Sequence, residues 1–377
     1  MKYLLSLIFL GFLGSVTAEE SCCVKQCLPD MPLPEYADQC SYLSPSRHCF
    51  RRSDDNYGIY LEADILFWQV RQRGLEYAVK DVNVFSLTQV QAEIINPEYH
   101  WQPGYRIFLG YNIPYDGWRA SAYFTHIHTK SYSHVRAELD PDNTGGGGGG
   151  LISVWTHPQS FHDAADFTRW SYATANWKLY FNMLTVELDR AFCVGQYLTV
   201  RPHFGVKGGT IHQRYNISYQ PGNTLFGSLH VFSSNVYLRN RTFGVGPFFG
   251  FASYWKAGDH WNFFGNLAGA LLSTKFQLFH NQSDSSSFSL DSVKLKDEYW
   301  TYRPQAELAL GITWSTCVGT PCKRTRYVGV SVSYEAQYWW KENEMIRYYD
   351  YENLGANLPT QAPLMMQGVT ASLAFDF

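Results

Sequence analysis

Charged residues stand alone or two apart within several stretches of the sequence that alternate apolar and polar side chains. They are Glu62, Asp64, Arg106, Arg119, Arg201, Arg303, Glu307 and Glu335. Residues two apart lie on one face of a β-strand, and a charge on a lipid-facing position is costly, so we expect these side chains to line the lumen of a barrel. Two kinds of chemistry fit: a charged constriction that screens small solutes by size and field, or ion pairs that satisfy one another across a narrow, filled barrel.

The ion-pair alternative is the better one for any single residue of this set. A ten-stranded barrel encloses only slightly more space than the roughly eight-stranded barrels that side chains can fill. A wide diffusion pore therefore does not follow from the charges, and their mixed signs leave the ion selectivity open.

Three other patterns could carry chemistry, and none is complete. His126 and His128 share one strand face, but no carboxylate or Cys completes a ligand set for a metal. The glycine run at residues 145–150 has no following Lys or helix, so it indicates a loop tip and not a phosphate cradle. We find no activated Ser, His and Asp motif of the kind a hydrolytic enzyme needs. The sequence predicts no catalytic residue, no metal and no cofactor.

The elements that must position the charges are strands. Aromatic residues make up 17% of the chain while the mean hydropathy is −0.26, which indicates apolar side chains at every second position. Ten stretches alternate in this way: residues 57–71, 104–113, 117–129, 171–189, 196–218, 235–256, 260–280, 299–315, 326–342 and 363–377. We therefore predict an all-β fold, an antiparallel transmembrane β-barrel of ten strands, with twelve as the alternative if the chain breaks near residue 209 or 240.

The connections between these stretches are alternately short and long, as in an outer-membrane barrel with short periplasmic turns and long outer loops. The short ones are residues 114–116, 190–195, 257–259 and 316–325, and the long ones are 72–103, 130–170, 219–234, 281–298 and 343–362. An even number of strands places both ends of the barrel in the periplasm.

The two faces of the strands are clearest in the last third of the chain. The expected lipid-facing sets are Trp300, Tyr302, Pro304, Ala306, Leu308, Leu310, Ile312 and Trp314, and then Val328, Val330, Val332, Tyr334, Ala336, Tyr338 and Trp340. Pro304 removes a ladder donor, so we expect a β-bulge there. The strand at 171–189 can be phased either way. The closing strand ends at Phe377, which we place at the periplasmic interface of the membrane.

The N-terminal region has a different composition. Residues 1–18 contain Lys2, an apolar run, and small residues at Val16 and Ala18, which is typical of a secretory signal peptide. No later run of about 18 apolar residues predicts a helical span. We divide the chain into the signal peptide, a flexible Cys- and Pro-rich periplasmic leader at 19–52, and the barrel at 53–377.

Eight cysteines provide candidates for disulfides. They are Cys22, Cys23, Cys27, Cys40, Cys49, Cys193, Cys317 and Cys322. Five lie in the leader and three in predicted short turns, so all are expected on the periplasmic side, where disulfides are made. Cys317 and Cys322 are close enough to bridge locally. For the leader, intramolecular bridges and bridges to other Cys-rich envelope proteins are both open, since sequence does not fix connectivity.

Eight phrases together resemble a known family. They are "YGIYLEADILFWQ", "VELDRAF", "YLTVRPHFGVKGG", "FGVGPFFGFASYW", "FFGNLAGALL", "RPQAELALGITW", "SYEAQYWW" and "QGVTASLAFDF". In this order, over residues 57–377, they resemble the pore-forming major-outer-membrane-protein-like proteins of Legionella and chlamydiae. The resemblance implies an outer-membrane barrel that acts as a porin or pore former and has no catalytic residues. It does not extend to the Cys-rich leader.

The sequence therefore predicts a porin-like channel of the bacterial outer membrane for passive passage of small solutes, which also serves as a disulfide-linked structural protein of the envelope. The alternative is a structural or adhesive barrel with a filled lumen, whose long outer loops bind a partner. The expected partners are outer-membrane lipid, the barrel assembly machinery and other Cys-rich envelope proteins. A homo-oligomer is one alternative for the assembly, and no basic stripe points to nucleic acid.

Overall fold

The computed structural model describes most of the chain from residue 58 onward, and no helix in this described part is long and apolar enough to cross a membrane. The described ranges are residues 58–80, 92–113, 118–137, 150–156, 170–194, 197–221, 231–258, 260–286, 290–318, 326–348 and 357–376. The signal peptide and the leader that the sequence predicts lie outside them.

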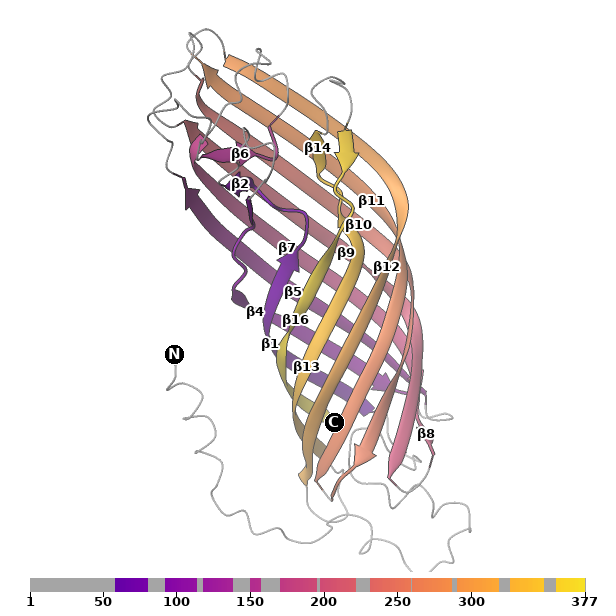
Figure 1. Ribbon diagram of the computed structural model, residues 1–377. Coiled ribbons are helices and arrows are strands. Elements are labelled where there is room, and N and C mark those ends of the chain that lie inside the picture. The colour runs from indigo at the N-terminus through magenta and orange to yellow at the C-terminus, as the bar shows by residue number, and fades with distance from the viewer. Residues whose placement is uncertain are drawn as a thin grey trace, which may run out of the picture.

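Ten long antiparallel strands close into a barrel (Figure 1). They are β1 (Gly58–Gln72), β4 (Trp101–Asn112), β5 (Trp118–Arg136), β7 (Trp170–Arg190), β9 (Leu198–Pro221), β10 (Val231–Lys256), β11 (Trp261–Ser286), β12 (Leu290–Val318), β13 (Arg326–Asn343) and β16 (Ala362–Asp376). Neighbours in this order pair with each other, and β1 also pairs with β16, which closes the ring. The predicted ten-stranded barrel is confirmed.

The twelve-stranded alternative is wrong, because β9 and β10 run unbroken through residues 209 and 240. The glycine at position 209 has a packing reason. A Cβ there would lie 2.1 Å from the carbonyl oxygen of Asn182 on β7. Only a residue without a side chain allows the two strands to approach this closely.

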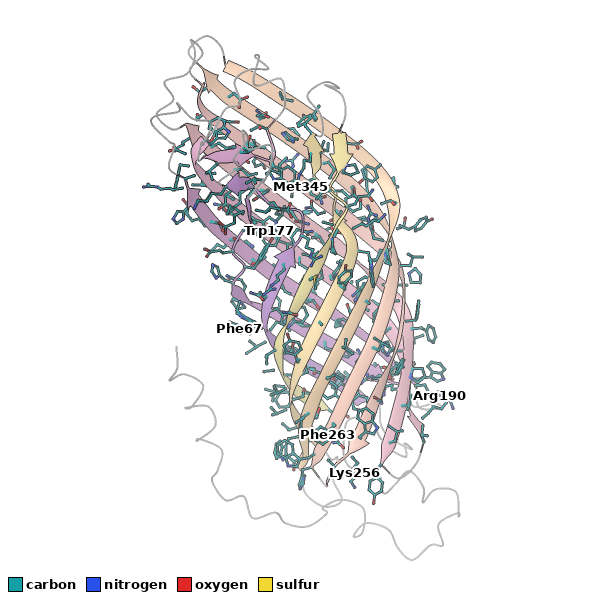
Figure 2. The ribbon with its side chains drawn as sticks, viewed as in Figure 1. Phe67, Trp177, Arg190, Lys256, Phe263 and Met345 are labelled. Carbon is teal, nitrogen blue, oxygen red and sulfur yellow. The ribbon has the colours of Figure 1, made fainter. Side chains whose placement is uncertain are left out.

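Side chains alternate between the outside and the lumen along every long strand. On β12 and β13 the predicted lipid-facing sets do face outward, among them Leu310 and Val332. From Ala173 onward, the ambiguous β7 places its odd-numbered residues in the lumen and its even-numbered ones outside. Figure 2 shows the same division: Phe67 and Phe263 project outward, whereas Trp177 and Met345 lie in the wider half of the barrel and are buried.

The expected bulge at Pro304 is wrong. Pro304 pairs with Leu271 of β11 in an unshifted register. On its other side, the ladder between β12 and β13 ends at Gln305, which pairs with Trp339. The missing N–H of the proline therefore breaks no ladder bond with β13, and no bulge is needed.

The two ends of the barrel differ. The end that carries Gly58 and Asp376 has the short connections, so by the usual arrangement of outer-membrane barrels we call it the periplasmic end and the opposite end the outer end. The outer end is oblique because β1 has 15 residues and β12 has 29. The predicted outer loop at 281–298 is wrong, since β11 and β12 stay paired from Ser285 and Leu290 inward. Residues 281–286 are polar on both faces, so this part of the hairpin shows no strand alternation, although Val293 and Leu295 alternate with Lys294 and Lys296 on β12.

Six short strands complete the structure: β2 (Ala78–Lys80), β3 (Glu93–Ile95), β6 (Leu151–Ser153), β8 (Phe192–Cys193), β14 (Ile346–Tyr348) and β15 (Asn357–Pro359). β8 lies at the periplasmic end and pairs with β9. β2 pairs with β3 and β6, and β6 pairs with β7, so the chain segments that follow β1 and β5 meet at the outer end of the barrel (Figure 1).

Candidate functional site: the charged belt and the plug

All eight charged residues that the sequence singled out face the lumen. Seven of them join three further side chains in the periplasmic half of the barrel, and we call this group the charged belt. It consists of Glu62, Asp64, Arg106, Arg119, Glu187, Asp189, Arg201, Lys207, Glu307 and Glu335. Arg303 is separate, because it forms an ion pair with Glu344 nearer the outer end.

Arg106 on β4 binds two carboxylates from different strands. Its guanidinium lies 2.9 and 3.2 Å from the two carboxylate oxygens of Glu335 and 3.4 Å from Asp64, while its Nε donates to Thr125 at 3.1 Å. A guanidinium fork fits a carboxylate in this bidentate manner. The arrangement joins β4 to its neighbour β1 and, past β16, to β13 on the lumen side of the wall.

Asp189 on β7 is shared by two arginines. Its carboxylate lies 2.8 Å from Arg119 on β5 and 2.9 Å from Arg201 on β9. Asp189 is almost fully buried, so water does not compete with the two guanidinium groups for its carboxylate. Lys207 and Glu307 form a third pair on β9 and β12. The two pairs of Asp189 therefore join neighbouring strands of the wall, whereas the Lys207–Glu307 pair joins strands that are not neighbours.

The belt surrounds a cavity of about 160 Å³. Several polar atoms at the cavity have no hydrogen-bond partner among the described residues, including Asp64 Oδ1, His203 Nε2 and Asn266 Oδ1. A polar cavity with unsatisfied donors and acceptors suits water or a small polar solute. Its volume is too small for a large molecule.

The outer half of the lumen is filled by the chain itself. Three segments, residues 73–80, 151–156 and 343–348, fold inward, and together we call them the plug. Their buried side chains form one apolar cluster with lumen-facing residues of the wall; members of this cluster are Leu75, Tyr77, Trp155 and Met345 from the plug and Trp68, Trp177, Phe181 and Tyr215 from the wall. The plug therefore closes the outer half by apolar packing.

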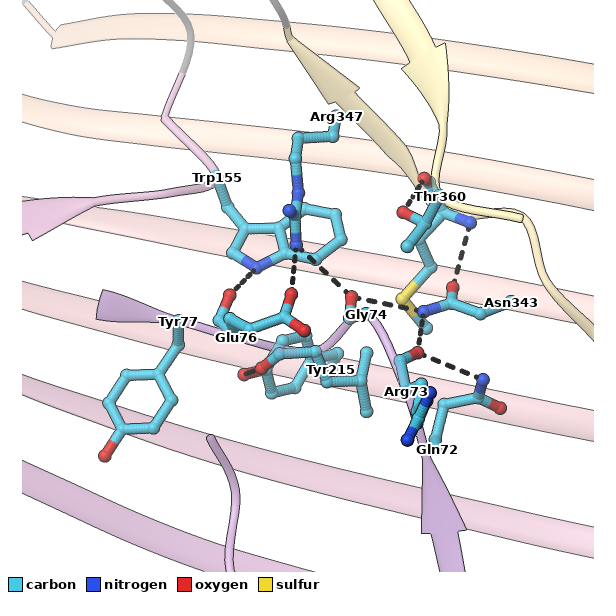
Figure 3. Close-up of polar contacts among 12 residues, drawn as sticks. Gln72, Arg73, Gly74, Glu76, Tyr77, Trp155, Tyr215, Asn343, Arg347 and Thr360 are labelled. Atoms are coloured by element: carbon cyan, nitrogen blue, oxygen red, sulfur yellow. Dashed lines mark hydrogen bonds and ion pairs between the residues drawn. The ribbon is translucent and has the colours of Figure 1, made fainter. Parts of the chain in front are cut away.

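Hydrogen bonds to the backbone hold residues 73–77 in place (Figure 3). Tyr215 Oη donates to the carbonyl of Leu75 at 2.6 Å, and Trp155 Nε1 donates to that of Glu76 at 2.7 Å. Asn343 Nδ2 donates to the carbonyls of Arg73 and Gly74 at 3.0 and 3.2 Å. Each bond contributes about 1 kcal/mol, so this segment is fastened to the wall and to both other parts of the plug.

Arg347 adds the charged contact of the plug. Its guanidinium lies 2.9 Å from Glu76 Oε2 and 3.3 Å from the carbonyl of Gly74, and it stacks 4.5 Å from the ring of Trp155 (Figure 3). Nearby, burial raises the pKa of Tyr77 to about 12. One residue thus connects all three segments of the plug.

A protein-family comparison matches residues 54–377 to the model described as "Legionella pneumophila major outer membrane protein precursor". The chain belongs to this family. It is therefore an outer-membrane β-barrel protein, as the resemblance predicted. No curated protein matches the chain.

Solved structures give weaker similarities. The outer membrane protease OmpT from Escherichia coli has 8% identity, a TM-score of 0.33, and coverage of 87% of this chain and 99% of its own. A Pseudomonas aeruginosa FadL homologue has 10% identity, a TM-score of 0.24, and coverage of 86% and 90%. These similarities are too low to bear on the function of this family member.

Three belt residues escaped the sequence interpretation: Glu187, Asp189 and Lys207. The first two lie in "VELDRAF", which does alternate, but the strand could not be phased. The reason is the plug. Toward the outer end of β7 the lumen-facing residues include Trp177 and Phe181, so the apolar face of the strand lies inside there. Near Asp189 the apolar face lies outside. Lys207 follows outward-facing Phe204 and Val206 on β9, so the alternation of this strand was a signal that places it on the same lumen face as Arg201.

The remaining predicted sites lie at the periplasmic end of this outer-membrane barrel or beyond the described residues. Cys193 pairs with Thr199 in the backbone ladder, and Cys317 with Tyr327. The five leader cysteines, Cys322 and Phe377 lie outside the described residues. Every disulfide therefore stays a prediction.

The two histidines that share a strand face lie on the outside of the barrel. His126 lies 2.6 Å from Asn182 Oδ1, and the ring of His128 stacks on Tyr180 at 4.2 Å. Within the part of the chain that the structure describes, no group of three or more His, Cys, Asp or Glu side chains could hold a metal ion.

Proposed function

We propose that this protein is an outer-membrane channel for small polar solutes and that the charged belt is the section that contacts the solute. The supporting observation is the contrast between the two halves of one lumen. The outer half is filled largely by the apolar cluster of plug and wall and holds few ion pairs, such as Arg303–Glu344, whereas ionisable residues concentrate around the cavity of the belt. Burying ion pairs contributes less to stability than apolar packing of the same volume. Stability alone therefore does not explain a belt of ten ionisable residues.

The belt supports a narrow channel. The cavity of about 160 Å³ and the cross-lumen pairs leave room for small solutes only. Rings of charged side chains act on a passing solute through their field, and unsatisfied polar atoms replace part of its hydration shell. The plug closes the outer half in the described state, so passage on this proposal requires residues 73–80 to move aside.

The second candidate is a structural or adhesive barrel that conducts nothing. The observation in its favour is the apolar cluster that joins the plug to the wall. On this alternative the belt only braces the strands, and the outer connections bind a host or a neighbouring cell. The cysteines suggest a structural role that is compatible with either candidate, in which the leader links the barrel covalently to other envelope proteins.

Single-channel recording on the refolded protein in a planar bilayer distinguishes the two candidates. We expect discrete conductance steps. Deletion of residues 139–148 serves as the matched test of the adhesive alternative, because these residues lie in an expected outer loop outside the plug and the belt. Adhesion lost on deletion, with no conductance in the folded parent protein, would replace the channel by the second candidate.

A further inference from the structure

Four cations from four neighbouring strands stand side by side on the outer surface of the barrel wall. Cross-strand register pairs Lys130 with Lys178, Lys178 with Arg214, and Arg214 with Arg239. Arg241 lies two residues from Arg239 on the same face of β10. We call these five residues the cationic row. Their chain neighbours, such as Thr129 and Gln213, are buried on the lumen side, so the row faces away from the barrel.

The row lacks counter-charges. Like charges directly opposite each other on paired strands repel. Among the described residues, none forms an ion pair with Lys130, Lys178, Arg214 or Arg241. Arg239 stacks 5.2 Å from the ring of Phe279, and its buried Nε has no hydrogen-bond partner there.

The adjoining part of the same wall shows the contrast. On β11, the next strand, Lys275 also faces outward, and it pairs with Glu298 of β12 at 2.5 Å. Lys275 therefore has an acidic partner on the neighbouring strand. The cationic row is left to a partner from outside.

The position of the row relative to the membrane identifies that partner. Moving outward along the strands, exposed apolar residues come first, such as Phe124 on β5 and Leu184 on β7. Aromatic residues typical of the membrane interface follow, with Tyr180 two residues from Lys178 and Phe243 two residues from Arg241. The cations come next, at the level of the lipid headgroups of the outer leaflet.

We propose that the cationic row binds phosphate groups of lipid headgroups in the outer leaflet. Arginine offers a planar fork of donors that fits phosphate oxygens, and lysine offers a mobile ammonium that extends to the headgroup while its stem stays among acyl chains. Clusters of basic residues at a membrane surface attract anionic lipids. A row of phosphates removes the repulsion between the cations, so both partners gain from the contact.

The test uses the full-length protein refolded in detergent, phosphorylated lipid A, the same lipid after removal of its phosphates, and inorganic phosphate. Native mass spectrometry and the thermal unfolding midpoint report binding. We expect phosphorylated lipid A to bind and to raise the midpoint, and the other two probes to do so at least tenfold more weakly. The double variant K178Q/R214Q should lose at least tenfold in affinity for phosphorylated lipid A.

A matched control is R71Q/R73Q, which removes two exposed cations at and just beyond the end of β1, outside the row. Its affinity should change less than twofold. Equal binding of both lipids, unchanged affinity of K178Q/R214Q, or inorganic phosphate binding as tightly as lipid A would each overturn the proposal. The measurement needs no conductance, so it stands or falls independently of the proposed channel.

Discussion

Arg347 and Glu76 form an ion pair of 2.9 Å that joins β14 to the segment after β1 across the outer end of the barrel. The two residues are about 270 positions apart in the chain, and each side chain is 29% exposed. Water can therefore reach the pair, whereas the apolar cluster beneath it is buried. On the proposed channel, this contact is the part of the plug that a small change can loosen without unfolding the barrel.

Glu76→Gln should make the plug open more often. The substitution keeps the shape of the side chain and removes an ion pair that contributes up to about 1 kcal/mol at this exposure, which corresponds to an increase of about fivefold in open probability. Single-channel recording measures it. Glu98→Gln is the control, because Glu98 is an exposed carboxylate near the outer end whose only described ion-pair partner is His100. Equal open probabilities in the two variants would contradict a gating role for the pair.

Gly74→Ala should loosen residues 73–80. Gly74 has φ of +75°, and a Cβ there would lie 2.1 Å from Thr360 Cγ2. The backbone strain alone costs roughly 1–2 kcal/mol. Hydrogen exchange should show faster exchange of these amides, while Gly258→Ala, where a Cβ meets no atom within 4 Å, leaves them unchanged. Adding Thr360→Ser should restore part of the protection, and its failure to do so would show that the close contact is not the cause.

Asp189→Asn should change both the selectivity and the stability of the barrel. It leaves Arg119 and Arg201 without their shared carboxylate, and an unpaired buried charge costs roughly 3 kcal/mol. The reversal potential in a KCl gradient should move toward chloride, and the unfolding midpoint should fall. Asp297→Asn is the control, since Asp297 is exposed on the outer part of β12. The same potential in both variants would mean that solutes do not pass the belt.

The barrel itself could be predicted from sequence because every crossing of a membrane needs an apolar outer face. Glu62 and Asp64 stand out between outward Leu61 and Ile65 for this reason. The same rule fails wherever the lumen is also apolar. On β7, lumen-facing Trp177 is apolar and outward Lys178 is charged, which reverses the usual polarity of the two faces. The sequence of β7 itself does not indicate that the plug lies against this strand.

Relationships across strands could not be predicted, since they depend on register. Asp189 receives Arg119 and Arg201 from two different strands, and no spacing in the sequence links the three. The cationic row is similar. Lys130 and Lys178 are isolated cations in the sequence, so it contains no basic stripe, yet the fold places them directly opposite each other. The cationic row runs across neighbouring strands, perpendicular to the direction of the chain, so it leaves no pattern along the sequence.

The leader cysteines should link the barrel to other envelope proteins. Cys22 and Cys23 are adjacent, and adjacent cysteines in a Pro-rich segment do not readily bridge to each other, so both need partners elsewhere. Non-reducing electrophoresis of isolated envelopes should show high-mass species that collapse on reduction and disappear in C22S/C23S/C27S. The control is C317S/C322S, which removes a bridge expected within one turn and should leave those species in place. A monomer in both the presence and absence of reductant would leave the outer-membrane barrel without a covalent anchoring role.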